Sequence, residues 1–112
     1  MTPAERNRAI KKVLGKVFGN DKVRVRGETG TAYGWVSIYI TVPKINCDCR
    51  QEGYTMGHRW DCEEFKKVSR EVDKKVRQAL EDSRLYDAIG NWTTDYGGEL
   101  KEYNVIIKEE GE

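Results

Sequence analysis

Apolar residues near the start of the chain recur at the spacing of one helical face. Thr2 and Glu5 form a capping-box pair around Pro3, and Gly19-Asn20 supplies a stop signal. The pattern therefore predicts a first helix that runs from Pro3 to the glycine. Its apolar stripe consists of Ile10, Val13, Leu14, Val17 and Phe18. Its opposite face, which we expect to be solvated, carries Arg6, Lys12 and Lys16.

Two strands are expected to follow this helix as a hairpin. Residues 22–26 alternate charged and apolar side chains, as a half-buried strand does. Residues 27–30 predict a turn, and the aromatic and β-branched residues of segment 33–42 predict a longer strand that Pro43 ends. One face of the hairpin is then apolar and formed by Val23, Val25, Val36, Ile38, Ile40 and Val42.

A second helix is predicted from near Asp61, after an irregular loop over residues 44–60. Asp61 and Glu64 repeat the cap-and-reach-back pattern. The apolar stripe of this helix consists of Phe65, Val68, Val72, Val76, Ala79 and Leu80. The remaining segments are a short helical turn that ends at Gly90, a polar loop over 91–99, a last strand over 103–107 and an acidic tail over 108–112.

The order helix–strand–strand–helix–strand predicts a two-layer α+β fold, in which helices cover one face of a small antiparallel or mixed three-stranded sheet. A chain of 112 residues has the length of one domain, which we place at 1–112. No run approaches the roughly 18 apolar residues of a membrane span, and the N-terminus lacks an apolar signal-peptide core. We therefore expect a cytoplasmic protein without a membrane partner.

The net charge of +1 conceals a strong asymmetry along the chain. Residues 1–26 hold eight Lys or Arg against two acidic residues, a net charge of +6, and the rest of the chain carries −5. Such polarity fits either an anionic partner for the basic end or two halves that attract each other.

All three cysteines and the only histidine fall within sixteen residues: Cys47, Cys49, His58 and Cys62. Cys3His is an established ligand set for a closed, tetrahedral structural zinc site. Cys47 and Cys49 could chelate together if the segment is extended, because residues i and i+2 then face the same side. Cys62 would lie at a helix N-terminus, where the helix dipole favours the thiolate that binds metal.

Two alternatives stay open for these residues. The first is a group of reduced, partly buried thiols near an unrelated histidine. The second is a small enzyme, in which Cys62 is a nucleophile and His58 its base, or in which loop carboxylates act. The carboxylates in question are Asp87, Asp95 and Glu99, whose spacing matches no known catalytic motif. A closed structural metal site would leave no histidine for acid–base work, so we favour a protein that is not an enzyme.

The outer face of the predicted hairpin interleaves cations with aromatic rings. Lys22, Arg24 and Arg26 would lie there beside Trp35 and Tyr39. Cations that bind phosphates and rings that stack on bases are how many sheets hold single-stranded nucleic acid. The alternative is that the rings are covered by loops and the arginines stack on them.

The hairpin tip offers a second candidate surface. Two glycines flank small residues there and permit close approach of a partner's backbone, which makes Gly30, Thr31, Tyr33 and Gly34 candidates for partner binding. The segment from Val23 through the tip to Ile38, preceded by the basic amphipathic helix, resembles the large polyvalent protein-associated domains of phages, plasmids and other mobile elements. This resemblance covers about the first forty residues. It implies a mobile-element setting and an accessory or host-interaction role, with no catalytic residues to carry over.

Three functions are therefore compatible with the sequence. The first is a zinc-stabilised binding module that contacts nucleic acid or a nucleoprotein through the basic–aromatic hairpin. The second is a protein-interaction module, such as an inhibitor of a host protein, and the third is a small cysteine- or carboxylate-dependent enzyme.

Overall fold

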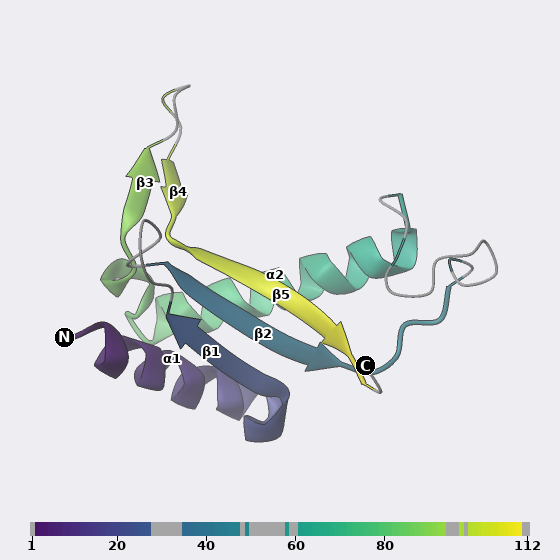
Figure 1. Cartoon of the computed structure of the whole chain (residues 1–112), viewed down its shortest axis with the longest axis horizontal. Coiled ribbons are helices and arrows are strands. Elements are labelled where there is room, and N and C mark those ends of the chain that lie inside the picture. The colour runs from purple at the N-terminus through teal and green to yellow at the C-terminus, as the bar shows by residue number, and fades with distance from the viewer. Residues whose placement is uncertain are drawn as a thin grey trace.

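The computed structural model describes residues 2–27, 35–47, 49, 58, 61–93, 97 and 99–110. Its elements, in chain order, are α1 (Pro3–Phe18), the 3-10 turn η1 (Asn20–Lys22), β1 (Val23–Gly27), β2 (Val36–Val42), α2 (Glu63–Asp82), the 3-10 turn η3 (Tyr86–Ala88), β3 (Asn91–Thr93), β4 (Glu99–Lys101) and β5 (Tyr103–Glu109). Figure 1 shows α1 and α2 running behind one sheet, with β3 and β4 standing away from it as a separate hairpin.

The main sheet is mixed and three-stranded, with the order β1-β2-β5. β1 pairs antiparallel with β2, so that Val23 lies opposite Ile40, and β5 pairs parallel with β2, so that Val105 lies opposite Ile38. A parallel partner needs a crossover connection, which is provided by the segment that contains α2. The predicted two-layer α+β fold with a mixed three-stranded sheet is confirmed.

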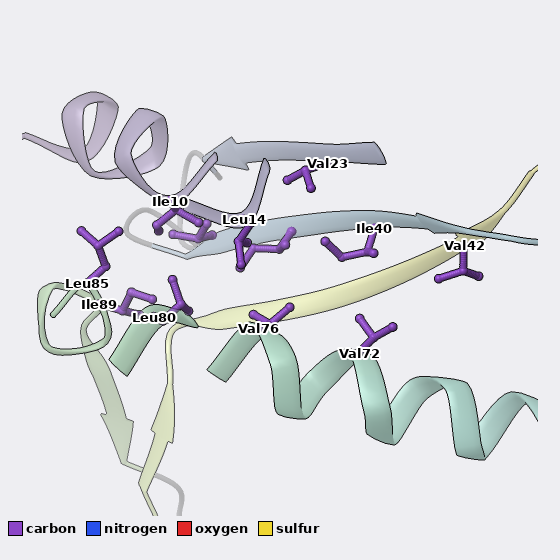
Figure 2. Close-up of a cluster of buried hydrophobic side chains, with 12 residues drawn as sticks. Ile10, Leu14, Val23, Ile40, Val42, Val72, Val76, Leu80, Leu85 and Ile89 are labelled. Carbon is purple, nitrogen blue, oxygen red and sulfur yellow. The ribbon is translucent and has the colours of Figure 1, made fainter. Parts of the chain in front are cut away.

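Both helices pack on the same face of the sheet, as predicted. The alternating apolar residues of β1 and β2 meet the helix stripes in one core, which Figure 2 shows between the layers. Its buried members are Ile10, Leu14, Val23, Val36, Ile38, Ile40, Val42, Val72, Val76, Leu80, Leu85 and Ile89. The other face of the sheet carries no helix in the part of the chain that the structure describes.

The first helix begins and ends as predicted, with two differences in burial. Thr2 is the N-cap, and its Oγ1 accepts a hydrogen bond from the Glu5 amide at 3.2 Å. Arg6, expected on the solvated face, is buried, whereas Val17 of the predicted apolar stripe is 48% exposed. The stripe is therefore narrower than the sequence pattern indicated: Ile10 and Leu14 are fully buried, and Val13 and Phe18 are partly buried against the core.

Several boundaries differ from the prediction. β1 is shifted by one residue from the expected 22–26, and β5 extends to Glu109, into the segment predicted as an acidic tail. Cys62, not Asp61, is the N-cap of α2. The second strand begins at Val36, three residues later than expected, and residues 33 and 34 lie outside the described part of the chain. The predicted polar loop over 91–99 contains β3 and the first residue of β4, which pair antiparallel. Short strands with few alternating residues carry too weak a pattern to be separated from loop.

Candidate metal centre and open sheet face

The four residues predicted as metal ligands converge in the structure. One ligand atom from each of Cys47, Cys49, His58 and Cys62 lies within 4.8 Å of the others. A tetrahedral ion with metal–sulfur distances of about 2.3 Å separates its ligands by about 3.8 Å. The spread of the observed ligand atoms is therefore close to that of a tetrahedral shell, and only small shifts would close it around an ion. Three thiols and an imidazole at this spacing could hold a metal ion.

The ligands come from different parts of the fold. Cys47 follows the C-terminal end of β2, and Cys49 is 1% exposed two residues further on. Cys62, the N-cap of α2, is 2% exposed. His58 stacks on Phe65 of that helix, with ring centroids 5.0 Å apart. The cluster therefore joins the end of the central strand to the beginning of the second helix.

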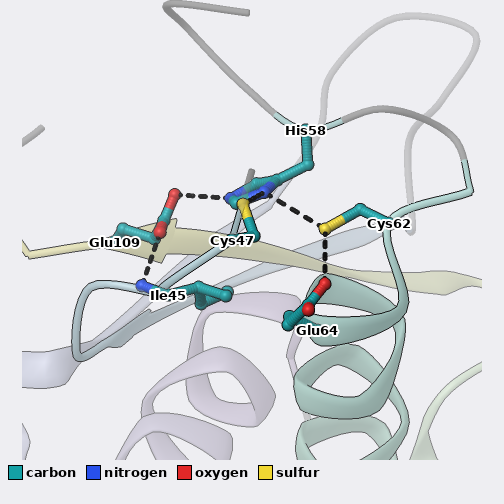
Figure 3. A network of polar contacts seen from close by, with 6 residues as sticks. All are labelled: Ile45, Cys47, His58, Cys62, Glu64 and Glu109. Atoms are coloured by element: carbon teal, nitrogen blue, oxygen red, sulfur yellow. Dashed lines mark hydrogen bonds and ion pairs between the residues drawn. The ribbon is translucent and has the colours of Figure 1, made fainter. Parts of the chain in front are cut away.

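His58 is oriented through both of its ring nitrogens (Figure 3). Its Nδ1 faces the sulfurs, 3.0 Å from Cys47 Sγ and 3.5 Å from Cys62 Sγ. Its Nε2 lies 2.9 Å from Oε2 of Glu109, at the end of β5. A carboxylate behind a metal-binding histidine fixes the ring and strengthens it as a ligand. The arrangement selects Nδ1 as the nitrogen available to an ion.

Glu109 is itself held in place. Its other carboxylate oxygen, Oε1, accepts a hydrogen bond of 2.7 Å from the backbone amide of Ile45. Side chains of His58 and Glu109 are only 9% and 10% exposed. A buried carboxylate that bridges the imidazole to the chain just before Cys47 couples the cluster to the last strand of the sheet.

The N-terminus of α2 acts on the Cys62 thiol in the predicted direction, but burial outweighs it. Burial raises its pKa to about 11, outweighing the hydrogen bond from the Phe65 amide that lowers it. The thiol also donates a hydrogen bond to Oε2 of Glu64, 3.6 Å away. The helix N-terminus is thus too weak to favour a free thiolate here. A bound cation would supply the missing positive charge, because metal ions deprotonate their thiol ligands.

The pKa of His58 is raised as well. Burial acts to lower it, but the hydrogen bonds to Glu109 and Cys49 together with their charges outweigh burial. The environment is therefore built to hold positive charge at this position, which suits either an imidazolium or a metal cation.

The uncovered face of the sheet brings together several of the predicted nucleic-acid contacts. Arg24 lies directly opposite Tyr39, and Arg26 lies opposite Ser37. Both arginines are exposed and Tyr39 is half-buried. No carboxylate pairs with either arginine in the part of the chain that the structure describes. The positive charge of this face is therefore available to a ligand.

A cation that the sequence analysis missed adds to this face. Lys108 of β5 places its Nζ 5.3 Å from the centroid of the Tyr39 ring. Lys22, by contrast, forms an ion pair with Glu110 at one end of the sheet. A hollow of about 210 Å³ separates these groups and is lined by Asp21, Lys22, Val23, Arg24, Tyr39, Thr41 and Lys108. Of the predicted phosphate contacts, Lys22 is therefore the one already neutralised.

The remaining predicted site residues lie elsewhere. Trp35 is half-buried just before β2, and the hairpin-tip residues Gly30, Thr31, Tyr33 and Gly34 lie outside the described residues. Of the three loop acids, Asp87 is exposed, Asp95 is outside the described residues, and Glu99 is described only as part of β4. Asp87 is therefore the one acid of the three whose side chain lies in the described part of the structure.

Comparison of the chain with protein-family models, curated proteins and solved structures gives no match. No helix in the described ranges is long and apolar enough to cross a membrane.

Proposed function

We propose that this protein is a non-enzymatic, zinc-stabilised module. It would bind single-stranded nucleic acid through the open face of its sheet. Zinc would be held by Cys47, Cys49, His58 and Cys62. The sheet residues would divide the work, with Arg24, Arg26 and Lys108 contacting phosphates and Tyr39 stacking on a base.

The choice of zinc rests on the donor set. Three sulfurs with one imidazole nitrogen suit zinc, whereas calcium and magnesium select oxygen ligands. Four protein ligands would also fill a tetrahedral shell and leave no open position for substrate. Glu109, behind His58, supplies the outer hydrogen bond that such sites commonly have.

The choice of nucleic acid rests on one observation: Arg24 lies opposite Tyr39 on a sheet face without a helix layer, and Lys108 lies over the same ring. Cations around a partly exposed ring offer both interactions that single strands need, charge for the backbone and a stacking surface for bases. An anionic protein surface could pair with the positive charges, but it has no bases to stack on the ring.

The enzyme alternative loses support from the geometry. A nucleophilic cysteine needs a thiolate, yet burial raises the pKa of Cys62 to about 11. The Nδ1 atom of His58 is shared between Cys47 and Cys62, so it is not dedicated to one of them as a general base. Our second proposal is a protein-interaction module, such as an inhibitor of a host protein that is encoded by a mobile element. It rests on the resemblance of the N-terminal segment and on the hairpin tip.

Salt dependence tests the nucleic-acid proposal. We expect a fluorescent single-stranded oligonucleotide to bind with an affinity that falls steeply as salt rises. The double substitution Arg24→Ala and Arg26→Ala should weaken binding by about tenfold or more and make the salt slope shallower by about 1.4. The matched control removes two exposed cations from α2, Arg70→Ala with Lys74→Ala, and should leave both quantities nearly unchanged. Salt-insensitive binding, or equal losses in the two variants, contradicts the proposal.

Elemental analysis of the purified protein tests the zinc proposal separately. We expect about one equivalent of zinc per chain. Less than about half an equivalent, in protein that still takes up no zinc when it is supplied, would contradict a structural zinc site.

A further inference from the structure

β5 forms one edge of the main sheet, and its outer side faces away from β2. The Glu102 carbonyl accepts from the Val36 amide, and the Glu110 amide donates to the Val42 carbonyl. Backbone groups alternate in direction along a strand, so those of Tyr103, Val105 and Ile107 point away from β2. No described residue hydrogen-bonds to these outward amides and carbonyls. In Figure 1 this side of β5 carries no further strand.

The side chains of the same three residues are incompletely covered. Their partners on β2 are Val36, Ile38 and Ile40, all of which are 0% exposed. Tyr103, Val105 and Ile107 pack against the same core but remain half-buried. The hydrophobic core therefore extends to the edge of the sheet, where the apolar side chains of β5 stay partly exposed. A hollow of about 560 Å³ runs beside this edge and is bordered by Asp73, Lys74 and Arg77 of α2.

The opposite edge of the sheet is protected. Lys11 of α1 donates from its Nζ to the Val23 carbonyl of β1 at 2.6 Å, and Arg24 and Arg26 add charge along that strand. Charged residues and covered backbone groups are how proteins prevent edge strands from pairing. β5 has an uninterrupted Val105-Ile106-Ile107 run instead.

We propose that β5 pairs antiparallel with β5 of a second copy, with Val105 facing Val105 of the partner across a twofold axis. This register lets the three outward-facing residues satisfy one another: Tyr103 opposes Ile107 of the partner, and Val105 opposes itself. The pairs on the core side are then all apolar, an aromatic against a β-branched residue and valine against valine, which are favourable cross-strand pairs. The result is a continuous six-stranded sheet.

Charge selects this register over its neighbour. With Val105 on the axis, Lys108 lies opposite Glu102 of the partner. A shift that places Ile106 on the axis would instead bring Glu102 opposite Glu110, two acids. The dimer would also join the two open faces, with Arg24, Arg26 and Tyr39 repeated on each half.

Cysteine cross-linking tests the register in the intact 112-residue chain loaded with zinc. Val105→Cys places two thiols on facing residues about 5.5 Å apart at Cα, within disulfide range, so oxidised glutathione should convert most of the chain to a covalent dimer. Ile107→Cys is the matched control, because its two copies would lie about 13 Å apart. The parent chain controls for the native cysteines. A covalent dimer that forms equally in both variants, or in neither, overturns the register.

Analytical ultracentrifugation tests the association itself without a covalent bond. We expect a concentration-dependent dimer of the 12.9 kDa chain. Lys108→Glu should weaken it by about tenfold because two attractive pairs become repulsive, and adding Glu102→Lys should restore it. A parent chain that stays monomeric at about 100 μM overturns the proposal. So does a dimer that neither Lys108→Glu weakens nor Val105→Cys cross-links, because it would use another surface or another partner strand.

Discussion

The metal cluster and the open sheet face are both rich in polar and charged side chains. They differ in whether those side chains have partners within the protein. In the cluster, His58 has partners at both nitrogens and Glu109 has partners at both oxygens, all within the chain. On the open face, Arg24 and Arg26 are exposed and have no carboxylate partner among the described residues. The polar groups of the metal cluster are thus satisfied by other groups of the protein, whereas the charges of the open face are exposed to solvent.

This difference separates a structural role from a binding role. A group that is buried and partnered contributes to stability, and its loss leaves other groups unsatisfied. An exposed, unpaired cation contributes little to stability, so its removal should hardly change the free energy of unfolding. Substitutions in the cluster should therefore change metal affinity and stability, whereas substitutions on the open face should change ligand affinity alone.

Cys62→Ser should have the largest effect and disrupt the closed site. Removing one of four ligands should lower zinc affinity by more than about 100-fold, and the thermal midpoint should fall by more than about 10 °C. Competition with a chromophoric chelator and circular dichroism measure the two effects. Glu63→Gln, at the neighbouring exposed position, should change neither. If the Cys62→Ser variant retains stability and zinc, the cluster is not a structural metal site.

Glu109→Gln should weaken the closed site without removing a ligand. Loss of the negative charge behind His58 should reduce zinc affinity by about 10- to 100-fold, while the metal content at saturating zinc stays at one equivalent. The neighbouring Glu110→Gln, which breaks only the pair with Lys22, is the matched control. Equal affinities in the two variants would show that the contact to His58 does not position the ring.

The pH dependence of stability should differ between metal-free and zinc-loaded protein. The folded Cys62 thiol has a pKa raised to about 11 from 9.0, so it stabilises the metal-free fold below pH 9, and this stabilisation is lost as the pH rises toward 11. Zinc-loaded protein already holds thiolates and should be unaffected there. It should instead lose metal as the pH falls, because protons compete for its ligands. Urea denaturation of both forms from acid to alkaline pH measures this, and parallel profiles would contradict it.

Tyr39→Ala should have the smallest of these effects. It should change oligonucleotide affinity only and leave metal binding and stability as they are. Loss of one stacking ring should weaken oligonucleotide binding by about five- to tenfold, with an unchanged salt slope because no phosphate contact is lost. Tyr39→Phe keeps the ring and should bind like the parent chain. If removing the ring leaves affinity unchanged, the face binds by charge alone and a nucleic-acid base is not stacked there.

Much of the fold was predictable because its elements carry strong periodic patterns. The stripe around Ile10 and Leu14, and the alternation in Val36, Ile38 and Ile40, each place their residues in the core as predicted. The four-residue metal cluster was also predictable, since all its ligands lie within sixteen residues of sequence.

The contacts missed by the sequence analysis involve β5. Glu109 and Lys108 looked like members of a solvated tail, and only the parallel register of β5 with β2 brings one to His58 and the other to Tyr39. Long-range pairing of this kind leaves no local pattern. The burial of Arg6 likewise depends on tertiary packing, and the raised pKa of Cys62 on burial that outweighs the helix terminus.

The contact between Glu109 and His58 spans 51 residues of sequence. Because the ribosome makes His58 before Glu109, metal affinity should depend on how much of the chain has been synthesised. A growing chain that has emerged through α2 already contains every cysteine and the histidine, but not the carboxylate that orients the imidazole. If the cluster holds the proposed metal ion, such a chain would bind it weakly and exchange it readily. Tight retention would begin only when the last strand docks beside β2, so firm metal binding would mark a completed sheet.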